Sequence, residues 1–436
     1  MRIKVVGAGL AGCEAAYQIA KRGIDVDLYE MKPAKRTPAH KSDLLCELVC
    51  SNSLRSNRLE NGAGLLKEEL RRLDSLIMRA ADMTCVPAGG ALAVDRVSFS
   101  TLVTNIIRSD KHINVIEHEV SDIVYTEDEP MIIATGPLTE GALLDSIENV
   151  MGEGLHFFDA AAPIISGESL DMDIVFEASR YERGSDYLNC PMDRDEYFNF
   201  VHELINAETA VLHGFEDKSV FEGCMPVETM AKRGEMTLAF GPLKPVGLVD
   251  ERTGKRPFAV VQLRREDKEG RAYNIVGFQT NLKFHEQKRV FSLIPGLANA
   301  EFLRYGVMHR NTFLDSPRKL NPATYEALNT PGLYFAGQIT GVEGYVESTA
   351  SGFVAGVNAA LKLLGRAEID FTTQTALGAL SHYVGEYAGH DFQPQNINFG
   401  LIDSLERKIR NKQERYRAIA DRSLEKIESI GKILLN

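Results

Sequence analysis

The first thirty residues constrain the fold more than any other part of the chain. An apolar run ends on the glycine-rich turn GAGLAG, a helical stretch follows, and a second apolar run ends at Glu30. In such a strand–turn–helix–strand unit Gly7 permits the tight turn, Gly9 lets a pyrophosphate approach the backbone, and Gly12 permits close packing of helix on strand. The helix N-terminus attracts phosphate, and Glu30 can accept hydrogen bonds from a ribose. The unit therefore predicts a dinucleotide-binding site.

Two later segments indicate which dinucleotide is bound. The segment IIATGP is a strand that ends near Gly136, and LYFAGQITGVEG is a strand that runs into glycines and then a helix. In flavoproteins with two such segments, both lie beside the first βαβ unit, and the second directs a helix N-terminus toward the flavin. We therefore predict FAD, with Gly337 and Gly341 beside the flavin. Since no second GxGxxG follows a strand, NAD(P)H would have to reach the flavin face directly.

The length and texture of the chain predict its domain organisation. A chain of 436 residues favours two domains, or one large domain with an insertion. Its middle third is rich in short strand candidates and turns. We predict an α/β fold: a Rossmann-like FAD-binding domain of the two-dinucleotide-motif flavoprotein type with an inserted smaller α+β domain. The FAD-binding domain would be discontinuous, covering 1–165 and 290–436, and the insertion domain would cover 166–289.

Apolar periodicity predicts further elements of the larger domain. The expected helices cover 62–81, 98–108, 349–364 and 402–435, and the expected strands cover 120–125 and 131–134. The last helix carries a cluster of basic residues, Arg407, Lys408, Arg410, Lys412, Arg415 and Arg417. These residues line either a solvated face or a face that contacts phosphate.

Composition narrows the class of protein and its compartment. The formal net charge is -12, so an RNA partner would need a local basic patch. No apolar run is long enough for a membrane helix, and the chain starts on a strand rather than a signal peptide. Six cysteines at irregular spacings indicate reduced thiols and do not form two pairs at zinc-ligand spacing. We expect a cytoplasmic protein without a metal site or membrane contact.

Two cysteines stand out as candidates for catalysis. Cys224 lies in a Gly–Cys–Met–Pro turn just before Lys232 and Arg233, and nearby cations favour the nucleophilic thiolate. Cys50 lies among hydroxyl and amide side chains, which suit proton handling better than strong nucleophilicity. A redox pair of Cys50 with Cys46 is a further reading. The remaining cysteines have the contexts of buried small residues.

Many motifs together resemble one family over nearly the whole length of the chain. They are GAGLAGCEAA, LYEMKP, TPAH, ELVCSNSLRS, VPAGGALAVDR, ATGPLT, FEGCMPVE, GFQTNLK, GVMHRNTF and GQITGVEGYVES. The chain resembles the folate- and FAD-dependent tRNA (uracil-5-)-methyltransferase family, which makes ribothymidine at position 54 in the T-loop of tRNA. In that family a one-carbon unit passes from methylenetetrahydrofolate, by way of reduced flavin, to C5 of uracil, and NAD(P)H restores the reduced flavin.

The resemblance implies a set of site residues and partners. Cys224 would add to C6 of uracil, and Cys50 would assist as base or shield, although these roles could be exchanged. The cofactor would be bound by Gly7, Ala8, Gly9, Leu10, Ala11, Gly12, Glu30, Met31, Lys32, Arg96, Gly136, Gly337, Gln338, Gly341, Gly344 and Tyr345. The substrate would be bound by His309, Arg310 and Asn311, with folate and the tRNA T-arm as partners and no stable protein partner implied.

Three other functions compete with this one. A related flavoprotein family modifies the wobble uridine of tRNA together with a GTPase, and it shares the GxGxxG motif and a similar GQ…G…GY segment. A flavin disulfide reductase could use Cys46 and Cys50, but it normally carries a second dinucleotide motif. A non-catalytic RNA-binding protein stabilised by FAD is the third. Mass spectrometry of tRNA after incubation with folate and NADPH separates all of these.

Overall fold

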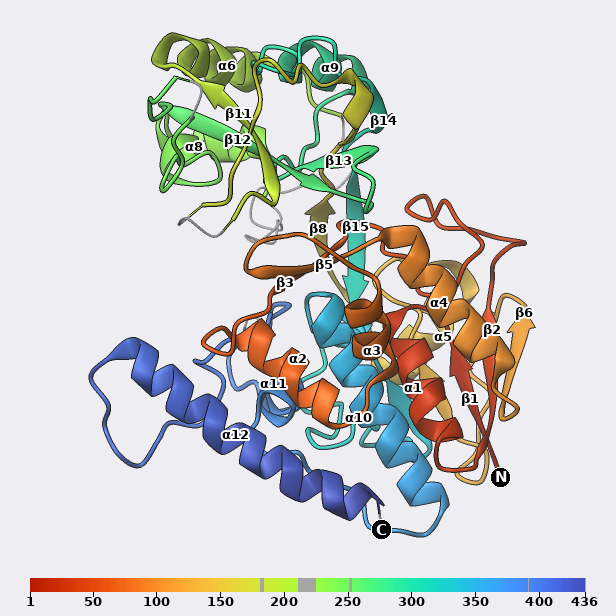
Figure 1. Ribbon diagram of the computed structural model, residues 1–436. Coiled ribbons are helices and arrows are strands. Elements are labelled where there is room, and N and C mark those ends of the chain that lie inside the picture. The colour runs from red at the N-terminus through yellow and green to blue at the C-terminus, as the bar shows by residue number, and fades with distance from the viewer. Residues whose placement is uncertain (181–183, 211–224, 251–252, 391, 436) are drawn as a thin grey trace.

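The larger part of the molecule is built on a parallel sheet. The computed structural model describes residues 1–180, 184–210, 225–250, 253–390 and 392–435 (Figure 1). The sheet has five strands in the order β16-β7-β1-β2-β6. These strands are Leu333–Phe335 (β16), Met131–Ile133 (β7), Arg2–Val6 (β1), Asp25–Glu30 (β2) and Ile113–Glu117 (β6). Because β7 pairs in parallel with both β1 and β16, the ATGP and FAGQ segments meet at one edge of the sheet.

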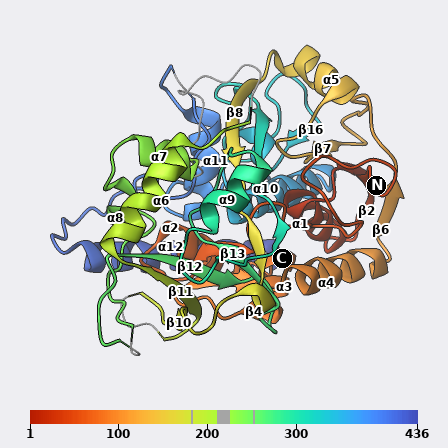
Figure 2. The same ribbon diagram turned by 90° about the horizontal axis from the view of Figure 1, so that it is seen from above.

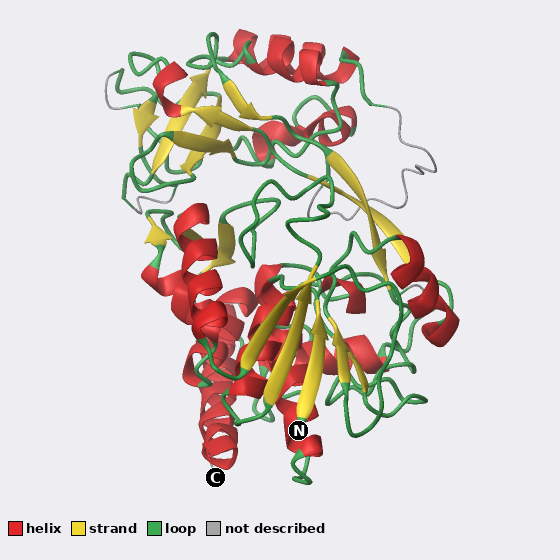
Figure 3. Ribbon diagram, turned by 90° about the vertical axis from the view of Figure 1, so that its right-hand side faces the viewer, coloured by secondary structure: helices red, strands yellow, loops and turns green. Residues whose placement is uncertain are grey.

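Helices α1 (Leu10–Ala20) and α10 (Tyr345–Leu363) cross each other closely. Figure 3 shows helices packed beside the parallel sheet. A Cβ atom at Gly352 would lie 2.2 Å from the Ala11 carbonyl oxygen, and one at Gly356 would lie 2.7 Å from Cα of Ala15. These two glycines let the helix backbones approach, and the crossing holds the start of α10 beside the start of α1. The surrounding helices are α2 (Gly62–Arg72), α3 (Leu76–Met83), α4 (Arg96–Ser109), α5 (Gly141–Met151), α11 (Ala376–Glu386) and α12 (Lys412–Leu435).

A second sheet organises the smaller part, which lies to one side of the parallel sheet when seen from above (Figure 2). Its six strands have the order β10-β11-β12-β13-β9-β14. They are Phe176–Glu177 (β10), Tyr187–Met192 (β11), Ala259–Arg265 (β12), Ala272–Ile275 (β13), Ile164–Ser166 (β9) and Phe302–Arg304 (β14). The accompanying helices are α6 (Arg194–Asn206), α7 (Val227–Lys232), α8 (Thr237–Phe240) and α9 (Phe284–Phe291).

Each part has its own hydrophobic core, and a two-stranded ladder connects them. The smaller core is formed by residues between Ile165 and Ala300. The antiparallel strands β8 (Leu155–Ala160) and β15 (Met308–Phe313) run between the two parts (Figure 1). The boundaries predicted at 165/166 and 289/290 stay a prediction. In the described part of the chain, no helix is both long and apolar enough to cross a membrane.

Several predicted elements differ from the structure. The helix expected at 62–81 is broken into α2 and α3, because Asp74 has φ of 60° and Ser75 caps the second helix. The strand expected at 120–125 is wrong: the edge strand is β6, and the later apolar residues only pack against the core. The C-terminal helix begins at Lys412, not at 402. The small sheet of β3 (Ser53–Ser56), β5 (Ala91–Val94) and β4 (Cys85–Val86) was not predicted.

Candidate active site

A cleft opens where strands of the parallel sheet end, which is where open α/β folds bind their ligands. It is lined by the glycine turn, the end of β2, the loop after β7, the segment after β16 and the start of α10. Of the predicted cofactor residues, those that line it are Gly7, Ala8, Gly9, Leu10, Ala11, Glu30, Met31, Gly136, Gly337, Gln338 and Tyr345. The cleft also contains residues that were not singled out, including Lys35, His40, Glu47, His118, Thr139 and Ser348.

The three glycines of the first turn are needed for different reasons, which the space around an added Cβ atom shows. Gly7 has φ of 97°, and a Cβ there would lie 2.6 Å from the Ala134 carbonyl oxygen. A Cβ at Gly12 would lie 1.8 Å from the Gly7 carbonyl oxygen. A Cβ at Gly9 meets nothing within 4 Å. The fold therefore requires Gly7 and Gly12, whereas a side chain at Gly9 would occupy the space of the cleft.

The glycine turn and Glu30 fit a dinucleotide. Helix α1 starts at Leu10 without a side-chain cap, so its first backbone N–H groups are available to an anion. The buried Glu30 carboxylate accepts hydrogen bonds from the backbone N–H of Ala8 and of Lys32, each at 3.1 Å. A carboxylate has capacity for further donors, such as ribose hydroxyls. This donor set matches a pyrophosphate and a ribose.

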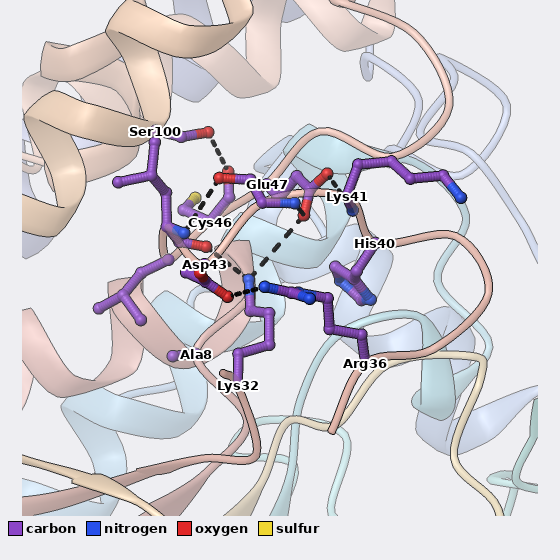
Figure 4. Close-up of polar contacts among 12 residues, drawn as sticks. Ala8, Lys32, Arg36, His40, Lys41, Asp43, Cys46, Glu47 and Ser100 are labelled. Carbon is purple, nitrogen blue, oxygen red and sulfur yellow. Dashed lines mark hydrogen bonds and ion pairs between the residues drawn. The ribbon is translucent and has the colours of Figure 1, made fainter. Parts of the chain in front are cut away.

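The loop after β2 is held by internal polar contacts (Figure 4). Lys32, predicted to bind cofactor, is buried; its Nζ donates to the Leu44 carbonyl oxygen at 2.5 Å and lies 4.0 Å from the Glu47 carboxylate. Glu47 also accepts two backbone N–H groups of the same loop, at 2.9 and 3.2 Å. Burial, and then Lys32, lowers the pKa of His40. Lys32 therefore shapes the wall of the cleft from behind rather than lining it.

Three arginines converge on the loop that carries Cys50. Arg96 donates to the carbonyl oxygen of Leu48, and Arg304 donates to the carbonyl oxygen of Val49. Arg264 donates to Oγ of Ser51 at 2.7 Å and to the side-chain oxygen of residue 52 at 2.9 Å. These arginines belong to α4, β14 and β12, so both parts of the molecule hold this one loop. Arg96 was also predicted to bind the cofactor. It lies in this network instead, and its guanidinium pairs with the buried carboxylate of Glu266, 2.7 Å away.

Tyr345 links the arginine network to the cleft. Its hydroxyl oxygen accepts hydrogen bonds from the backbone N–H groups of Cys50, at 2.8 Å, and Ser51, at 3.2 Å. Cys50 is partly exposed and lies within electrostatic reach of all three guanidinium groups. Neighbouring cations favour a thiolate. Hydroxyl and amide side chains adjoin Cys50 in the sequence, and the structure adds cations that are remote in sequence around its loop.

The last two glycines between β16 and α10 shape the turn that leads into α10. Gly341 and Gly344 have φ of 90° and 119°. Added Cβ atoms would lie 2.5 Å from the ring of Phe392 and 2.3 Å from the carboxylate of Glu347. These glycines are absent from the lining of the cleft and instead let the chain turn into α10.

The other reactive candidates lie at different places. Cys224 is outside the described residues, but both flanks of its segment are anchored: Ala210 N–H donates to the Asn281 carbonyl oxygen, and Val227 N–H donates to that of Gln279. Cys46 is buried, and burial raises the pKa of its thiol, so a redox pair with Cys50 gains no support.

The three predicted substrate residues follow one another in β15. Among these, Asn311 is buried, and only the backbone placement of His309 and Arg310 is described. The strand lies against the cleft wall, because the next residue, Thr312, donates its N–H to the carbonyl oxygen of Pro137, which lines the cleft. The strand thus runs behind the loop that follows β7.

Comparison with known proteins agrees with this geometry. The family model described as Glucose inhibited division protein A matches residues 2–367. The chain is 61% identical over 424 residues to a protein of Acetivibrio thermocellus, covering 97% of each chain. It is 58% identical over 429 residues to one of Lactobacillus gasseri, covering 98% of this chain and 97% of that one. Both are named methylenetetrahydrofolate–tRNA-(uracil-5-)-methyltransferase TrmFO.

A solved structure supports the fold alone. Aquifex aeolicus GidA matches with a TM-score of 0.71 at 16% identity, covering 99% of this chain and 73% of that one. This likeness confirms the predicted α/β fold class. The family model and the extended sequence identity show that the chain belongs to the family of methylenetetrahydrofolate–tRNA-(uracil-5-)-methyltransferases.

Proposed function

We propose that this enzyme methylates C5 of the T-loop uridine at position 54 of tRNA, with methylenetetrahydrofolate as the one-carbon donor. The observation that carries the proposal is the identity of 58–61% to relatives so named, over nearly the full length of both chains. FAD is the bound cofactor, NAD(P)H is the external reductant, and the T-arm of tRNA is the macromolecular partner. The enzyme works in the cytoplasm without a stable protein partner.

The cleft binds FAD through the groups already described. The backbone of the glycine turn and the N-terminus of α1 hold the pyrophosphate, Glu30 holds the ribose, and Tyr345 stands at the flavin end. Bound FAD supplies a one-carbon carrier and the reducing equivalents. We assign folate binding to the substrate residues of β15, because a cationic residue such as Arg310 suits the carboxylates of folate by its charge.

The chemistry at uracil requires a thiolate and a base. Attack of the Cys224 thiolate forms a bond from sulfur to C6 and moves an electron pair toward C5, which makes C5 nucleophilic. After C5 has gained its carbon substituent, a base removes the C5 proton, the bond from sulfur to C6 breaks, and the thiolate returns. Cys50 assists beside the flavin as base or shield. The uridine reaches these groups after leaving its stack.

The division of roles between the cysteines can be tested by covalent trapping. With tRNA carrying 5-fluorouridine at the target, C5 has no proton to lose, so a protein–RNA adduct accumulates in the wild type. We expect the adduct with Cys50→Ala and none with Cys224→Ala. An adduct with Cys224→Ala but not with Cys50→Ala would reverse the assignment, and adducts with both variants would exclude both thiols as nucleophile.

Position-specific digestion tests the proposed function. Unmodified tRNA is incubated with the enzyme, methylenetetrahydrofolate and NADPH. It is then cut into defined fragments, and the mass of each fragment is measured by mass spectrometry. We expect a mass increase of one methyl group in the T-loop fragment. A change confined to the anticodon fragment would favour the wobble-uridine function, and no change in any fragment would favour the non-catalytic RNA-binding function.

A further inference from the structure

A short basic segment stands out against the acidic chain. Four side chains before and at the start of α12 define a basic strip: Arg407, Lys408, Arg410 and Lys412. All four are exposed, although the chain has a net charge of -12. In the described part of the chain none of the four forms an ion pair, whereas Arg417, further along, pairs with Glu60 and Asp421. Exposed cations without internal ion pairs are available to an external polyanion.

A groove lies beside the basic strip. Its walls come from the start of α12, the segment after β3, the turn between β4 and β5, and the sheet of the smaller part. Arg58, Arg180 and Lys412 supply cations to its lining, and Glu60 is the one carboxylate among the described lining residues. Because Arg58 and Glu60 lie 3.8 Å apart and offset each other, Arg180 and Lys412 give the described lining a net positive charge.

Aromatic side chains flank the same groove. Tyr416, in the lining, stacks on Phe399 with ring centroids 4.2 Å apart and an angle of 8° between the planes. Lys412 and Arg415 lie 5.4 and 5.5 Å from the centroid of the Tyr416 ring. Cations combined with fixed aromatic rings are the groups that bind nucleic-acid backbones and bases. An anionic membrane surface would favour exposed apolar side chains instead.

The groove leads toward the Cys50 loop. Tyr187, in its lining, is the cross-strand partner of Arg264. Gln262, also in the lining, lies two residues before Arg264 and therefore on the same face of β12. Arg264 in turn donates to Ser51, the neighbour of Cys50. Arg264 thus connects the strand that lines the groove to the loop that carries Cys50.

We propose that the basic strip and this groove bind the sugar–phosphate backbone of the substrate tRNA, outside the nucleotide that is methylated. This inference rests on the proposed function and adds to it the surface that the RNA occupies. It also explains how an acidic protein binds a polyanion, because one local basic surface offsets the repulsion of the overall charge.

Salt-dependent binding tests the proposal. Unmodified tRNA is titrated by filter binding at several salt concentrations with the wild type and with Arg407→Ala/Lys408→Ala/Arg410→Ala/Lys412→Ala. We expect at least about tenfold weaker binding of the variant near 0.1 M salt, and a slope of log affinity against log salt that is shallower by about 3. Flavin absorbance and the melting temperature should stay at the wild-type values.

The control removes the same charge elsewhere, from the exposed lysines Lys111, Lys268, Lys288 and Lys432. Its affinity should stay within about twofold of the wild type, with an unchanged slope. Equal affinity and slope for the basic-strip variant and the wild type would overturn the inference alone. If the basic-strip variant binds tRNA normally but no longer binds anionic phospholipid vesicles, the inference is overturned in favour of a lipid surface. Failure of the wild type to bind tRNA would overturn the proposed function as well.

Discussion

The cofactor cleft and the Cys50 loop adjoin each other but are built in opposite ways. The glycine turn of the cleft is formed by the backbone of one short motif, in which Gly7 and Gly12 set the path of the chain and Gly9 leaves space for a ligand. The Cys50 loop is held by side chains from α4, β12, β14 and α10, which belong to both parts of the molecule. A site for a common cofactor can be local, whereas the reactive loop depends on the whole fold.

The largest effect should come from a side chain added at Gly9, which tests whether the glycine turn alone admits the cofactor. Because a Cβ there meets no protein atom within 4 Å, Gly9→Val should fold normally and fill the space where the pyrophosphate approaches. We expect loss of nearly all bound FAD, measured from the visible spectrum of the purified protein. Gly431→Ala in α12, where the nearest neighbour is a leucine methyl group at 3.7 Å, is the control and should stay yellow. A fully loaded Gly9→Val protein would refute the local description of the cleft.

The second prediction concerns the arginine network. Arg96→Ala leaves Glu266, a mostly buried carboxylate, without its partner at 2.7 Å and should cost about 3 kcal/mol of unfolding free energy. Arg108→Ala removes an ion pair with Glu117, in which both side chains are 45% exposed, and should cost less than about 1 kcal/mol. Urea unfolding measures both. Equal costs would mean that the network adds little beyond an exposed ion pair.

These two regions also show what the sequence could predict. The turn at Gly7, Gly9 and Gly12 is confirmed, because the motif follows an apolar strand and opens a helix within a few residues. Arg264 and Arg304 carry no comparable signal, since they lie more than 200 positions from Cys50 and meet it only when two separate cores pack together. Lys32 differs, since its partners are close in sequence, but its place in a motif does not reveal that its amine points back into its own loop.

A third prediction addresses the residue that joins the two regions. Tyr345→Phe keeps the ring at the cleft but leaves the N–H groups of Cys50 and Ser51 without their acceptor. We expect a loss of about 1–2 kcal/mol of unfolding free energy, together with a changed rate of alkylation of Cys50 by iodoacetamide. Tyr125→Phe, which alters a ring packed against the same core, should change neither. An unchanged alkylation rate in Tyr345→Phe would show that the hydroxyl does not position the loop.

The smallest expected effect compares two histidines through pH. Burial, and then Lys32, lowers the pKa of His40 in the cleft, so the unfolded chain takes up the proton more readily and stability should fall as pH drops below about 6.5. Burial alone would lower the pKa of His382, but its hydrogen bonds to Glu386 and Asp370 outweigh burial and raise it. Its contribution should therefore be present below about 6.5 and be lost as pH rises.

Both histidine contributions should be below about 1 kcal/mol in urea unfolding between pH 5.5 and 7.5. His40→Gln should remove the first slope, and His382→Gln should remove the second, which has the opposite sign. If both variants shift the pH profile in the same direction, the cleft histidine is not in the desolvated setting that the structure gives it.

The origin of the transferred carbon is the most direct test of the whole account. Unmodified tRNA is incubated with the enzyme, NADPH and methylenetetrahydrofolate labelled with carbon-13 at the methylene carbon, with unlabelled S-adenosylmethionine present as a competing donor. Mass spectrometry of the digested nucleosides should give 5-methyluridine that is heavier by one mass unit, with no such product from Gly9→Val. Unlabelled 5-methyluridine, or label on any nucleoside other than 5-methyluridine, would contradict the account.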